Sequence, residues 1–170
     1  DLANYRILHF ATHGFVTAPQ IGCPARPSLL TSIGAVDSDG LLSFGEIFDL
    51  KIDADVVILS ACDTAGQASA LATQEAGLRT GGGTALDGLV RAFIGAGGRS
   101  VIASHWPAPD EYNATERLIS GLFLARNISV ADAMRQTQTA LMDDPNTSHP
   151  FYWSGFAIVG DGSRPFLGGS

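Results

Sequence analysis

Four short apolar segments constrain the fold of this chain more than any other feature of its sequence. They are residues 6–11, 56–60, 100–104 and 156–160. In each segment the apolar residues are nearly continuous rather than alternating, which is typical of strands that are buried on both faces of a parallel sheet. Such a sheet needs helices on both faces to cover it. The four segments therefore predict a central, mostly parallel sheet inside a layered domain.

Two of the segments between these strands predict helices. Ser43 and Glu46 have the spacing of a capping box, in which the side chain of each residue accepts a hydrogen bond from the backbone N–H of the other. Residues 86–94 place leucine, valine, phenylalanine and isoleucine at helical spacing, and Gly97 and Gly98 would end that helix. We therefore expect one short helix over 43–50 and a longer one directly before the third strand.

Two further helices are expected between the third and fourth strands. One runs from Asp110, a typical N-cap residue, to about Arg126, and the other runs from Ser129 to about Met142. Strands that alternate with helices predict an α/β fold whose crossovers are right-handed. A length of 170 residues without an internal repeat or a boundary predicts a single domain over 1–170.

The remaining sequence predicts loops and a narrow range of partners. Residues 16–40 and 65–85 are rich in small and polar residues, and loops of that length are usually functional. The net charge is −7 and no cluster of Lys and Arg is present, so we expect no nucleic-acid binding. No apolar stretch reaches the length of a membrane span, so we expect no such span either. Only Cys23 and Cys62 carry thiols, which favours a reducing, cytoplasmic compartment over a disulfide framework.

Chemically active side chains follow the predicted strands. His13 comes directly after the first strand, Cys62 after the second and His105 after the third. Ligands of open parallel sheets bind beyond the carboxyl ends of the strands, so a thiol and an imidazole would meet at one edge. The imidazole would favour the thiolate, and the backbone N–H groups of Gly14 and Cys62 could stabilise an oxyanion. This arrangement predicts attack on a peptide carbonyl through an acyl-enzyme.

Other interpretations of the same residues stay open at this point. Taken alone, Cys62 and His13 could each be inert structural residues, and His105 competes with His13 as the general base. The glycine after His13 leaves room for substrate, which favours His13. The spacing of His9 and His13 suits a metal site only on a helix, so on this strand we expect no metal and a buried His9. His149 is expected to be structural, and acyl chemistry of this kind needs no cofactor.

Four ordered blocks of sequence resemble a known family. They are HFATHGF (9–15), LLSFGEIFDLKIDADVVILSACDTAG (41–66), GLVRAFIGAGGRSVIASHWPAPD (88–110) and HPFYWSGFAIVG (149–160). Together they closely resemble the CHAT domain, a family of bacterial caspase-like proteins in the same broad class as caspases and separases. The resemblance implies a three-layer caspase–hemoglobinase fold and a cysteine endopeptidase with a Cys/His dyad.

The resemblance also assigns roles to individual residues. The family's histidine falls on His13 and its cysteine on Cys62, with Gly14 and Cys62 supplying the oxyanion donors. Metacaspase-like relatives select a basic residue through an acid two positions before the cysteine, where this chain has Ser60, so no such specificity is implied. The block S-x-W…D matches Ser104, Trp106 and Asp110, which are candidate substrate-pocket or structural residues.

The resemblance finally suggests what surrounds this domain. CHAT domains normally have further strands before the THG block, and tetratricopeptide repeats often lie upstream. We therefore expect a piece of a longer protein that acts on a protein or peptide substrate and responds to an activating partner or to such repeats. The alternative hypothesis is a catalytically silent caspase-like module that binds partners in a signalling assembly.

Overall fold

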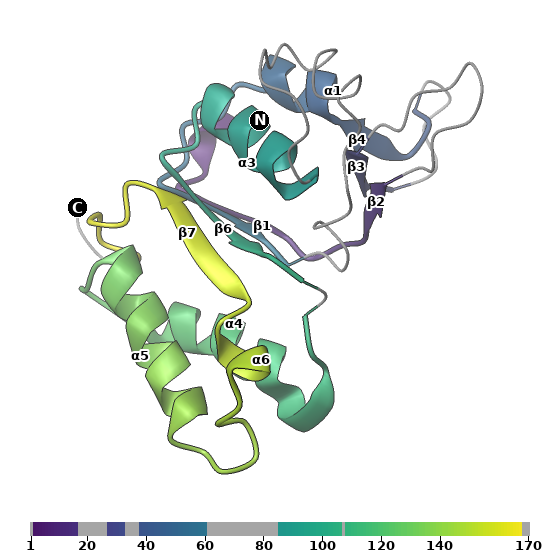
Figure 1. Ribbon diagram of the computed structural model, residues 1–170. Helices are drawn as coiled ribbons and strands as arrows, with labels where there is room; N and C mark the ends of the chain where they lie inside the picture. Colours follow the sequence, from purple (N-terminus) through teal and green to yellow (C-terminus); the bar gives the residue numbers. More distant parts are fainter. Residues whose placement is uncertain (1, 17–26, 33–37, 61–84, 107, 168–170) are drawn as a thin grey trace.

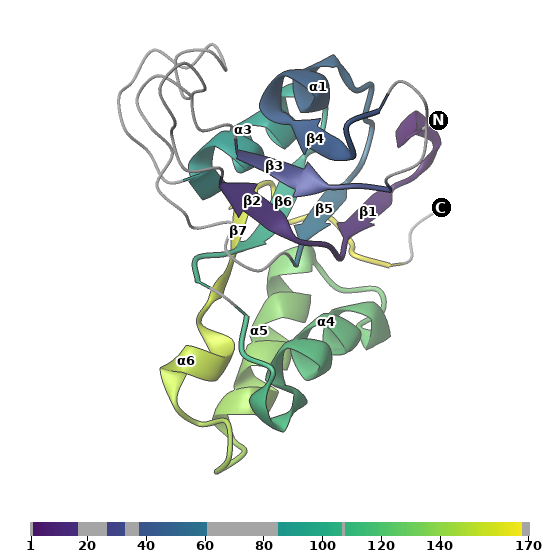
Figure 2. The same cartoon turned by 90° about the vertical axis from the view of Figure 1, so that its right-hand side faces the viewer.

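The fold described below comes from a computed structural model of the chain (Figure 1). It describes residues 2–16, 27–32, 38–60, 85–106 and 108–167. Within these ranges a central sheet lies between two layers of helices, and a second, smaller sheet lies beside it (Figures 1 and 2). The chain therefore has the mixed α/β architecture that its sequence predicts.

The central sheet contains all four predicted strands, β1 (Ile7–Phe10), β5 (Val56–Leu59), β6 (Ser100–Ser104) and β7 (Phe156–Gly160). Their order is β1-β5-β6-β7. The first three are parallel, as predicted, whereas β7 runs antiparallel to β6. β7 is an edge strand and becomes exposed toward its end, so the expectation that its apolar run marks a parallel strand buried on both faces is wrong. The sheet as a whole is mostly parallel.

Helices cover both faces of this sheet (Figure 1). Alternate residues of β5 point to opposite faces, so that Val57 and Leu59 join one apolar cluster, and Val56 and Ile58 join the other. The first cluster contains side chains of α1 and α3, and the second contains those of α4 and α5. The helices span α1 (Phe44–Asp49), α3 (Ala85–Gly95), α4 (Ala114–Leu124) and α5 (Val130–Met142).

Three of the predicted helix boundaries are confirmed. Ser43 and Glu46 form the expected capping box, in which the N–H of Ser43 donates to Oε2 of Glu46 at 2.8 Å. Gly97 follows α3 with a φ of 110°, and a Cβ there would lie 2.0 Å from the carbonyl oxygen of Ile52. Ser129 caps α5, since its hydroxyl accepts the N–H of Asp132 at 3.0 Å. The residues that begin or end these three helices are therefore predicted correctly from the sequence.

The expected start of α4 at Asp110 is wrong. Asp110 precedes a short 3-10 helix, η2 (Glu111–Asn113), and its side chain makes no capping hydrogen bond. Tyr112 and Asn113 have φ values of 56° and 53°, which interrupt the helical path, and α4 begins only at Ala114. The sequence gives no glycine to mark this interruption, so the pattern could not reveal it.

The expectation that residues 16–40 form a loop is also wrong in part. An antiparallel second sheet has the order β2-β3-β4 and consists of β2 (Gly14–Val16), β3 (Pro27–Leu30) and β4 (Leu41–Ser43). Strands this short carry too few residues to show an alternating pattern. Residues 65–84 of the other expected loop lie outside the described residues, and residue 85 begins α3.

A short helix that the sequence did not reveal precedes the last strand. It is α6 (Pro150–Trp153), and Nδ1 of His149 accepts the N–H of Phe151 at 3.2 Å as its cap. The prediction that His149 is structural is thereby confirmed. Among the described residues, none of the helices is both long and apolar enough to cross a membrane.

A buried carboxylate, Asp55, lies where the parallel strands of the central sheet begin. We call this end of the sheet its amino-terminal edge, and the end where these strands finish its carboxyl edge. The Nε of Arg6 lies 2.7 Å from the Asp55 carboxylate, and guanidinium nitrogens of Arg164 and Arg99 lie at 3.3 Å and 3.6 Å. The hydroxyl of Ser100 also donates to the Asp55 carbonyl at 2.8 Å. These contacts join the starts of three strands to the C-terminal segment of the fold.

Candidate active site

The carboxyl ends of β1 and β5 lie side by side in the central sheet (Figure 2). Phe10 pairs with Leu59 at the end of the ladder, and the N–H of Ser60 then donates to the Phe10 carbonyl at 3.2 Å. His13 follows Phe10 at the same distance along the chain as Cys62 follows Leu59. Cys62, the candidate nucleophile and oxyanion donor, lies outside the described residues.

The backbone around His13 is fixed by the second sheet. The N–H of Leu30 donates to the His13 carbonyl at 2.8 Å, and the hydroxyl of Thr12 donates to the Leu30 carbonyl at 2.7 Å. Leu30 is the last residue of β3. His13 itself is exposed, so its imidazole is accessible at this edge while its backbone is held.

Gly14 begins β2 directly after His13. The bond from the Leu30 N–H to the His13 carbonyl makes these two residues a hydrogen-bonded pair, next in register to the pair of Gly14 and Leu29. Because antiparallel pairs alternate between hydrogen-bonded and non-hydrogen-bonded, Gly14 and Leu29 form a non-hydrogen-bonded pair. The N–H of Gly14 is therefore directed away from β3, as a donor to a developing oxyanion requires.

A second histidine contacts the end of β5. Nε2 of His9 lies 2.6 Å from Oγ of Ser60, and the ring of His9 lies 6.1 Å from that of Phe123 in α4. Partial burial lowers the pKa of His9 by desolvation. The expectation that His9 is buried is wrong, since its strand β1 is the edge of the central sheet and His9 stays exposed.

His105 lies on the other side of β5. It follows β6, its side chain is exposed, and its N–H donates to the Gly155 carbonyl at 2.8 Å. Because β5 lies between β1 and β6, both His13 and His105 follow strands that neighbour β5. The order of strands alone does not choose between these two histidines as the base.

The candidate pocket residues differ in their surroundings. Ser104 is buried at the end of β6, opposite Phe156. The indole N–H of Trp106 donates to the Phe151 carbonyl at 3.2 Å, and the two rings stack with centroids 6.4 Å apart. Asp110 is exposed, and its carbonyl accepts the N–H of Asn113 at 3.1 Å. Trp106 is thus fixed near the sheet edge, whereas the Asp110 carboxylate remains in solvent.

Comparison with known proteins agrees with this architecture. The model of the CHAT domain matches residues 1–161. The chain belongs to the CHAT domain family. It is also 25% identical over 125 residues to the human Tetratricopeptide repeat protein 28 (Homo sapiens), across 71% of this chain. The chain spans only about 4% of the length of that relative. The family is peptidase-related and caspase-like in fold, in agreement with the mostly parallel sheet between two helical layers.

Several residues of this CHAT domain near the strand ends were missed by reasoning from sequence. Thr12 adjoins the candidate base, but a side-chain hydrogen bond to β3 could not be foreseen because β3 itself was not predicted. Tyr112, Phe151 and Tyr152 form aromatic contacts next to Trp106. The aromatic run in HPFYW was the available signal for two of them.

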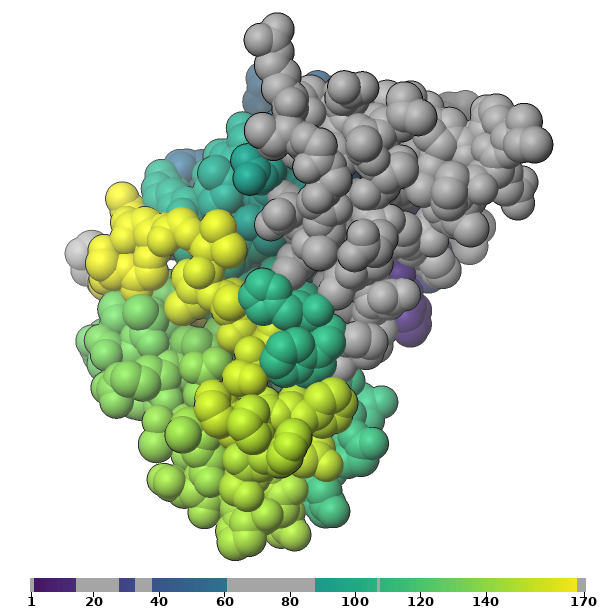
Figure 3. Space-filling model, viewed as in Figure 1, coloured from purple at the N-terminus to yellow at the C-terminus, as the bar shows by residue number. Residues whose placement is uncertain are grey.

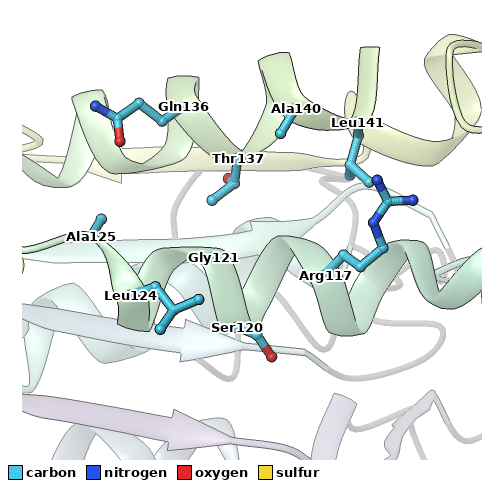
Figure 4. A pocket seen from close by; sticks show the side chains of 9 residues that line it. All are labelled: Arg117, Ser120, Gly121, Leu124, Ala125, Gln136, Thr137, Ala140 and Leu141. Carbon is cyan, nitrogen blue, oxygen red and sulfur yellow. The ribbon is translucent and has the colours of Figure 1, made fainter. Parts of the chain in front are cut away.

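The CHAT domain also has a pocket of about 480 Å³ between α4 and α5 (Figure 4). The two helices approach closely there, since a Cβ on Gly121 would lie 2.4 Å from Cγ2 of Thr137. This pocket belongs to the helical layer and not to the strand ends. Its lining consists of Arg117, Ser120, Gly121, Leu124, Ala125, Gln136, Thr137, Ala140 and Leu141. Within the described ranges, no group of three or more His, Cys, Asp and Glu residues could hold a metal ion.

Proposed function

We propose that this CHAT domain is a cysteine endopeptidase in which Cys62 is the nucleophile and His13 the general base. The observation that carries this proposal is the register of β1 and β5. Their last paired residues, Phe10 and Leu59, precede His13 and Cys62 by the same number of residues on adjacent parallel strands. A nucleophile and a base must meet in space, and neighbouring strand ends bring such groups together.

The proposed reaction is acyl transfer to the thiol of Cys62. His13 removes the thiol proton, and the thiolate attacks the carbonyl carbon of the scissile peptide bond. The N–H groups of Gly14 and Cys62 donate to the resulting oxyanion, which the outward direction of the Gly14 N–H supports. His13 then protonates the leaving amine, and water hydrolyses the thioester to release the second product.

The substrate is a protein or peptide, and we propose that its residue before the scissile bond is not selected for positive charge. Ser60 stands where metacaspase-like relatives carry an acid, and its hydroxyl contacts His9. Desolvation lowers the pKa of His9, so this pair is uncharged at neutral pH. An uncharged pair offers no counter-charge to a lysine or arginine side chain.

Control by a partner or by neighbouring repeats is the second part of the proposal. The human relative is a tetratricopeptide repeat protein, and this chain spans a small share of it. Repeats of this kind present extended binding surfaces, so they suit recognition of an activator or a substrate. A reducing compartment keeps the thiol of Cys62 free, and we propose the cytoplasm as that compartment.

Selective alkylation tests the dyad without a known substrate. The protein is treated with iodoacetamide or a peptidyl acyloxymethyl ketone, and the adduct is mapped by mass spectrometry. We expect Cys62 to react faster than Cys23, and His13→Ala to remove the difference because the thiolate loses its partner. His105→Ala is the matched control and should retain fast labelling of Cys62.

Each other outcome has a definite meaning. Equal labelling of both cysteines, or labelling that His13→Ala does not slow, would support the catalytically silent binding module. Dependence on His105 instead would transfer the role of the base to that residue. Mapping new protein termini in a lysate treated with wild-type or Cys62→Ala protein then identifies the substrate, and cleavage by Cys62→Ala at the wild-type rate would refute the nucleophile.

A further inference from the structure

Four aromatic side chains form a continuous row beside the carboxyl edge of the central sheet. The ring centroids of Trp106 and Phe151 are 6.4 Å apart, those of Phe151 and Tyr152 are 5.5 Å apart, and those of Tyr152 and Tyr112 are 5.8 Å apart. We call these four residues the aromatic row. It joins the segment after β6 to α6, and the contact of Tyr152 with Tyr112 joins α6 to η2.

The aromatic row is fixed in place but remains open to solvent. Phe151 is 43% exposed and Tyr112 is 57% exposed, so neither ring is accounted for by the core. Trp106 is held by its hydrogen bond to the Phe151 carbonyl and by close packing on Gly155, where a Cβ would lie 3.0 Å from the indole. Figure 3 shows the teal segment after β6 lying against the yellow segment of α6 and β7 on the visible face.

The backbone at one end of the row is strained. Tyr112 has a φ of 56°, a conformation that bulky residues rarely adopt, and Asn113 follows with 53°. Strain of this kind persists where the surrounding structure imposes it, and it clusters at ligand-binding sites. Here it places the Tyr112 ring edge-on against Tyr152.

The row begins just beyond the end of β6, the strand that neighbours β5 in the central sheet. Ala103 of β6 pairs with Leu59 of β5. Trp106 follows Ala103 at the same distance along the chain as Cys62 follows Leu59. A polypeptide bound at the proposed site therefore has the aromatic row as its neighbour on the β6 side.

The two sequence segments that carry the aromatic row have acidic side chains but no Lys or Arg. These segments, 105–116 and 145–155, contribute the carboxylates of Asp110, Glu111 and Glu116. The next residue, Arg117, is paired with Asp144 at 2.9 Å. Aromatic faces beside carboxylates attract cations, through the ring quadrupole and through direct charge complementarity.

We propose that the aromatic row binds a lysine or arginine side chain of the polypeptide substrate, at a position away from the residue that precedes the scissile bond. The inference rests on the proposed peptidase function for the identity of its occupant. The binding itself requires no thiol, so it can be measured on Cys62→Ala protein. It assigns substrate recognition to α6 and η2, which lie outside the dyad.

Binding of matched peptides to ¹⁵N-labelled Cys62→Ala protein tests the proposal. The chain has two tryptophans, so two indole N–H signals are expected, and Trp106→Phe identifies the relevant one. The probes are acetylated and amidated Gly-Ser-Gly-X-Gly-Ser-Gly peptides in which X is arginine, lysine, norleucine or glutamate. We expect the arginine and lysine peptides to shift the Trp106 signal and to bind roughly two- to fivefold tighter than norleucine.

Variants separate recognition by the rings from a general loss of structure. Phe151→Leu keeps an apolar side chain of similar size but removes the aromatic face, and it should abolish the preference for arginine over norleucine. Asp110→Asn combined with Glu111→Gln should reduce that preference and its dependence on salt. Tyr5→Ala is the control, because Tyr5 is 59% exposed but is not part of the aromatic row.

Three results would overturn the proposal. Equal binding of the arginine and norleucine peptides would remove the charge preference, and an unchanged preference in Phe151→Leu would remove the rings from it. Self-association in sedimentation velocity that Phe151→Leu abolishes would identify a second copy of the chain as the occupant. Failure of Cys62 to be labelled would refute the peptidase function but would leave these binding results standing, so the two failures are distinguishable.

Discussion

The two edges of the central sheet use polar residues in different ways. At the amino-terminal edge three arginines contact the buried carboxylate of Asp55. The hydroxyl of Ser100 also donates to the backbone carbonyl of Asp55. Among the described residues at the carboxyl edge, the hydroxyl of Thr12 donates to the Leu30 carbonyl and His9 contacts the hydroxyl of Ser60. Within the described residues, several contacts compensate the one buried charge at the first edge, whereas the contacts at the second edge lie beside exposed side chains.

This difference follows from what each edge must do. Burying a carboxylate is costly unless it is paired, so the contacts of Asp55 make that edge rigid and intolerant of change. A site that receives a ligand must instead leave donors unpaired within the sheet and rings exposed, as the Gly14 N–H is directed away from β3 and Phe151 is exposed. We therefore expect substitutions at the first edge to affect mainly stability and those at the second to affect mainly reactivity.

The largest expected effect is on the amino-terminal edge. Asp55→Ala should lower the free energy of unfolding by about 2–4 kcal/mol, because it removes the shared partner of Arg6, Arg99 and Arg164. Urea denaturation followed by circular dichroism measures the change. Asp53→Ala is the matched control, since Asp53 pairs with Arg99 in solvent and should contribute less than about 1 kcal/mol.

The comparison of the two edges also predicts what Asp55→Ala leaves unchanged. In its folded fraction, the rate of Cys62 alkylation should equal that of the wild type. A loss of stability below about 0.5 kcal/mol would show that the surrounding arginines do not need this carboxylate. A slowed alkylation in fully folded protein would show that the two edges are coupled.

The next largest effect concerns the hydrogen bond from Thr12 to β3, which positions the backbone next to His13. Thr12→Val keeps the shape of the side chain but removes the hydroxyl that donates to Leu30 at 2.7 Å. We expect alkylation of Cys62 to slow about tenfold because His13 is positioned less well, with a loss of about 1 kcal/mol in stability. Alkylation is measured across pH, which separates a changed thiolate pKa from a changed rate.

Thr12→Ser supplies the control for this positioning role. It retains the hydroxyl and should restore most of the alkylation rate. If Thr12→Val unfolds more easily but alkylates Cys62 at the wild-type rate and pH dependence, Thr12 contributes only to stability. That result would leave the second sheet without a role at the proposed site.

The sequence predicted those parts of the fold that depend on local or periodic signals. The four strands follow from continuous apolar runs, and the start of α5 follows from Ser129 as an N-cap. The short strand β3 gave no such signal, because its pairing with β2 and β4 depends on contacts distant in sequence. The direction of β7 was hidden for the same reason, since an apolar run does not record the direction of its neighbour.

The candidate site was predicted in outline only. Strand ends identified His13 and Gly14, but they also identified His105, and the strand order leaves both histidines beside β5. The aromatic row could not be predicted, because it pairs Trp106 with Phe151, which is distant in sequence, and includes Tyr112, whose positive φ is one that tyrosine rarely adopts. The choice of the base and the arrangement of the aromatic row therefore depend on tertiary contacts, which the sequence pattern does not record.

A smaller effect concerns the strain at Tyr112. Tyr112→Gly should be more stable than Tyr112→Ala by about 1 kcal/mol, because glycine adopts a φ of 56° without a steric penalty. Thermal unfolding of the two variants measures this difference, and both should lose binding of the arginine peptide equally. Equal stability of the two variants would show that the positive φ carries no strain.

The smallest expected effect is the pH dependence of the stability that His9 contributes at the carboxyl edge. Desolvation lowers the pKa of His9, so the folded protein binds fewer protons at this site than the unfolded chain. The contribution of His9 to stability is therefore fully present above its ordinary pKa of 6.5 and is lost as the pH falls through its lower folded value.

Urea denaturation at pH 7.5 and 5.0 should show a smaller loss of stability in His9→Gln than in wild type. The difference should stay below about 1 kcal/mol, since the ring is exposed. An equal or larger loss in His9→Gln would mean that desolvation does not lower the pKa of His9 in the folded protein.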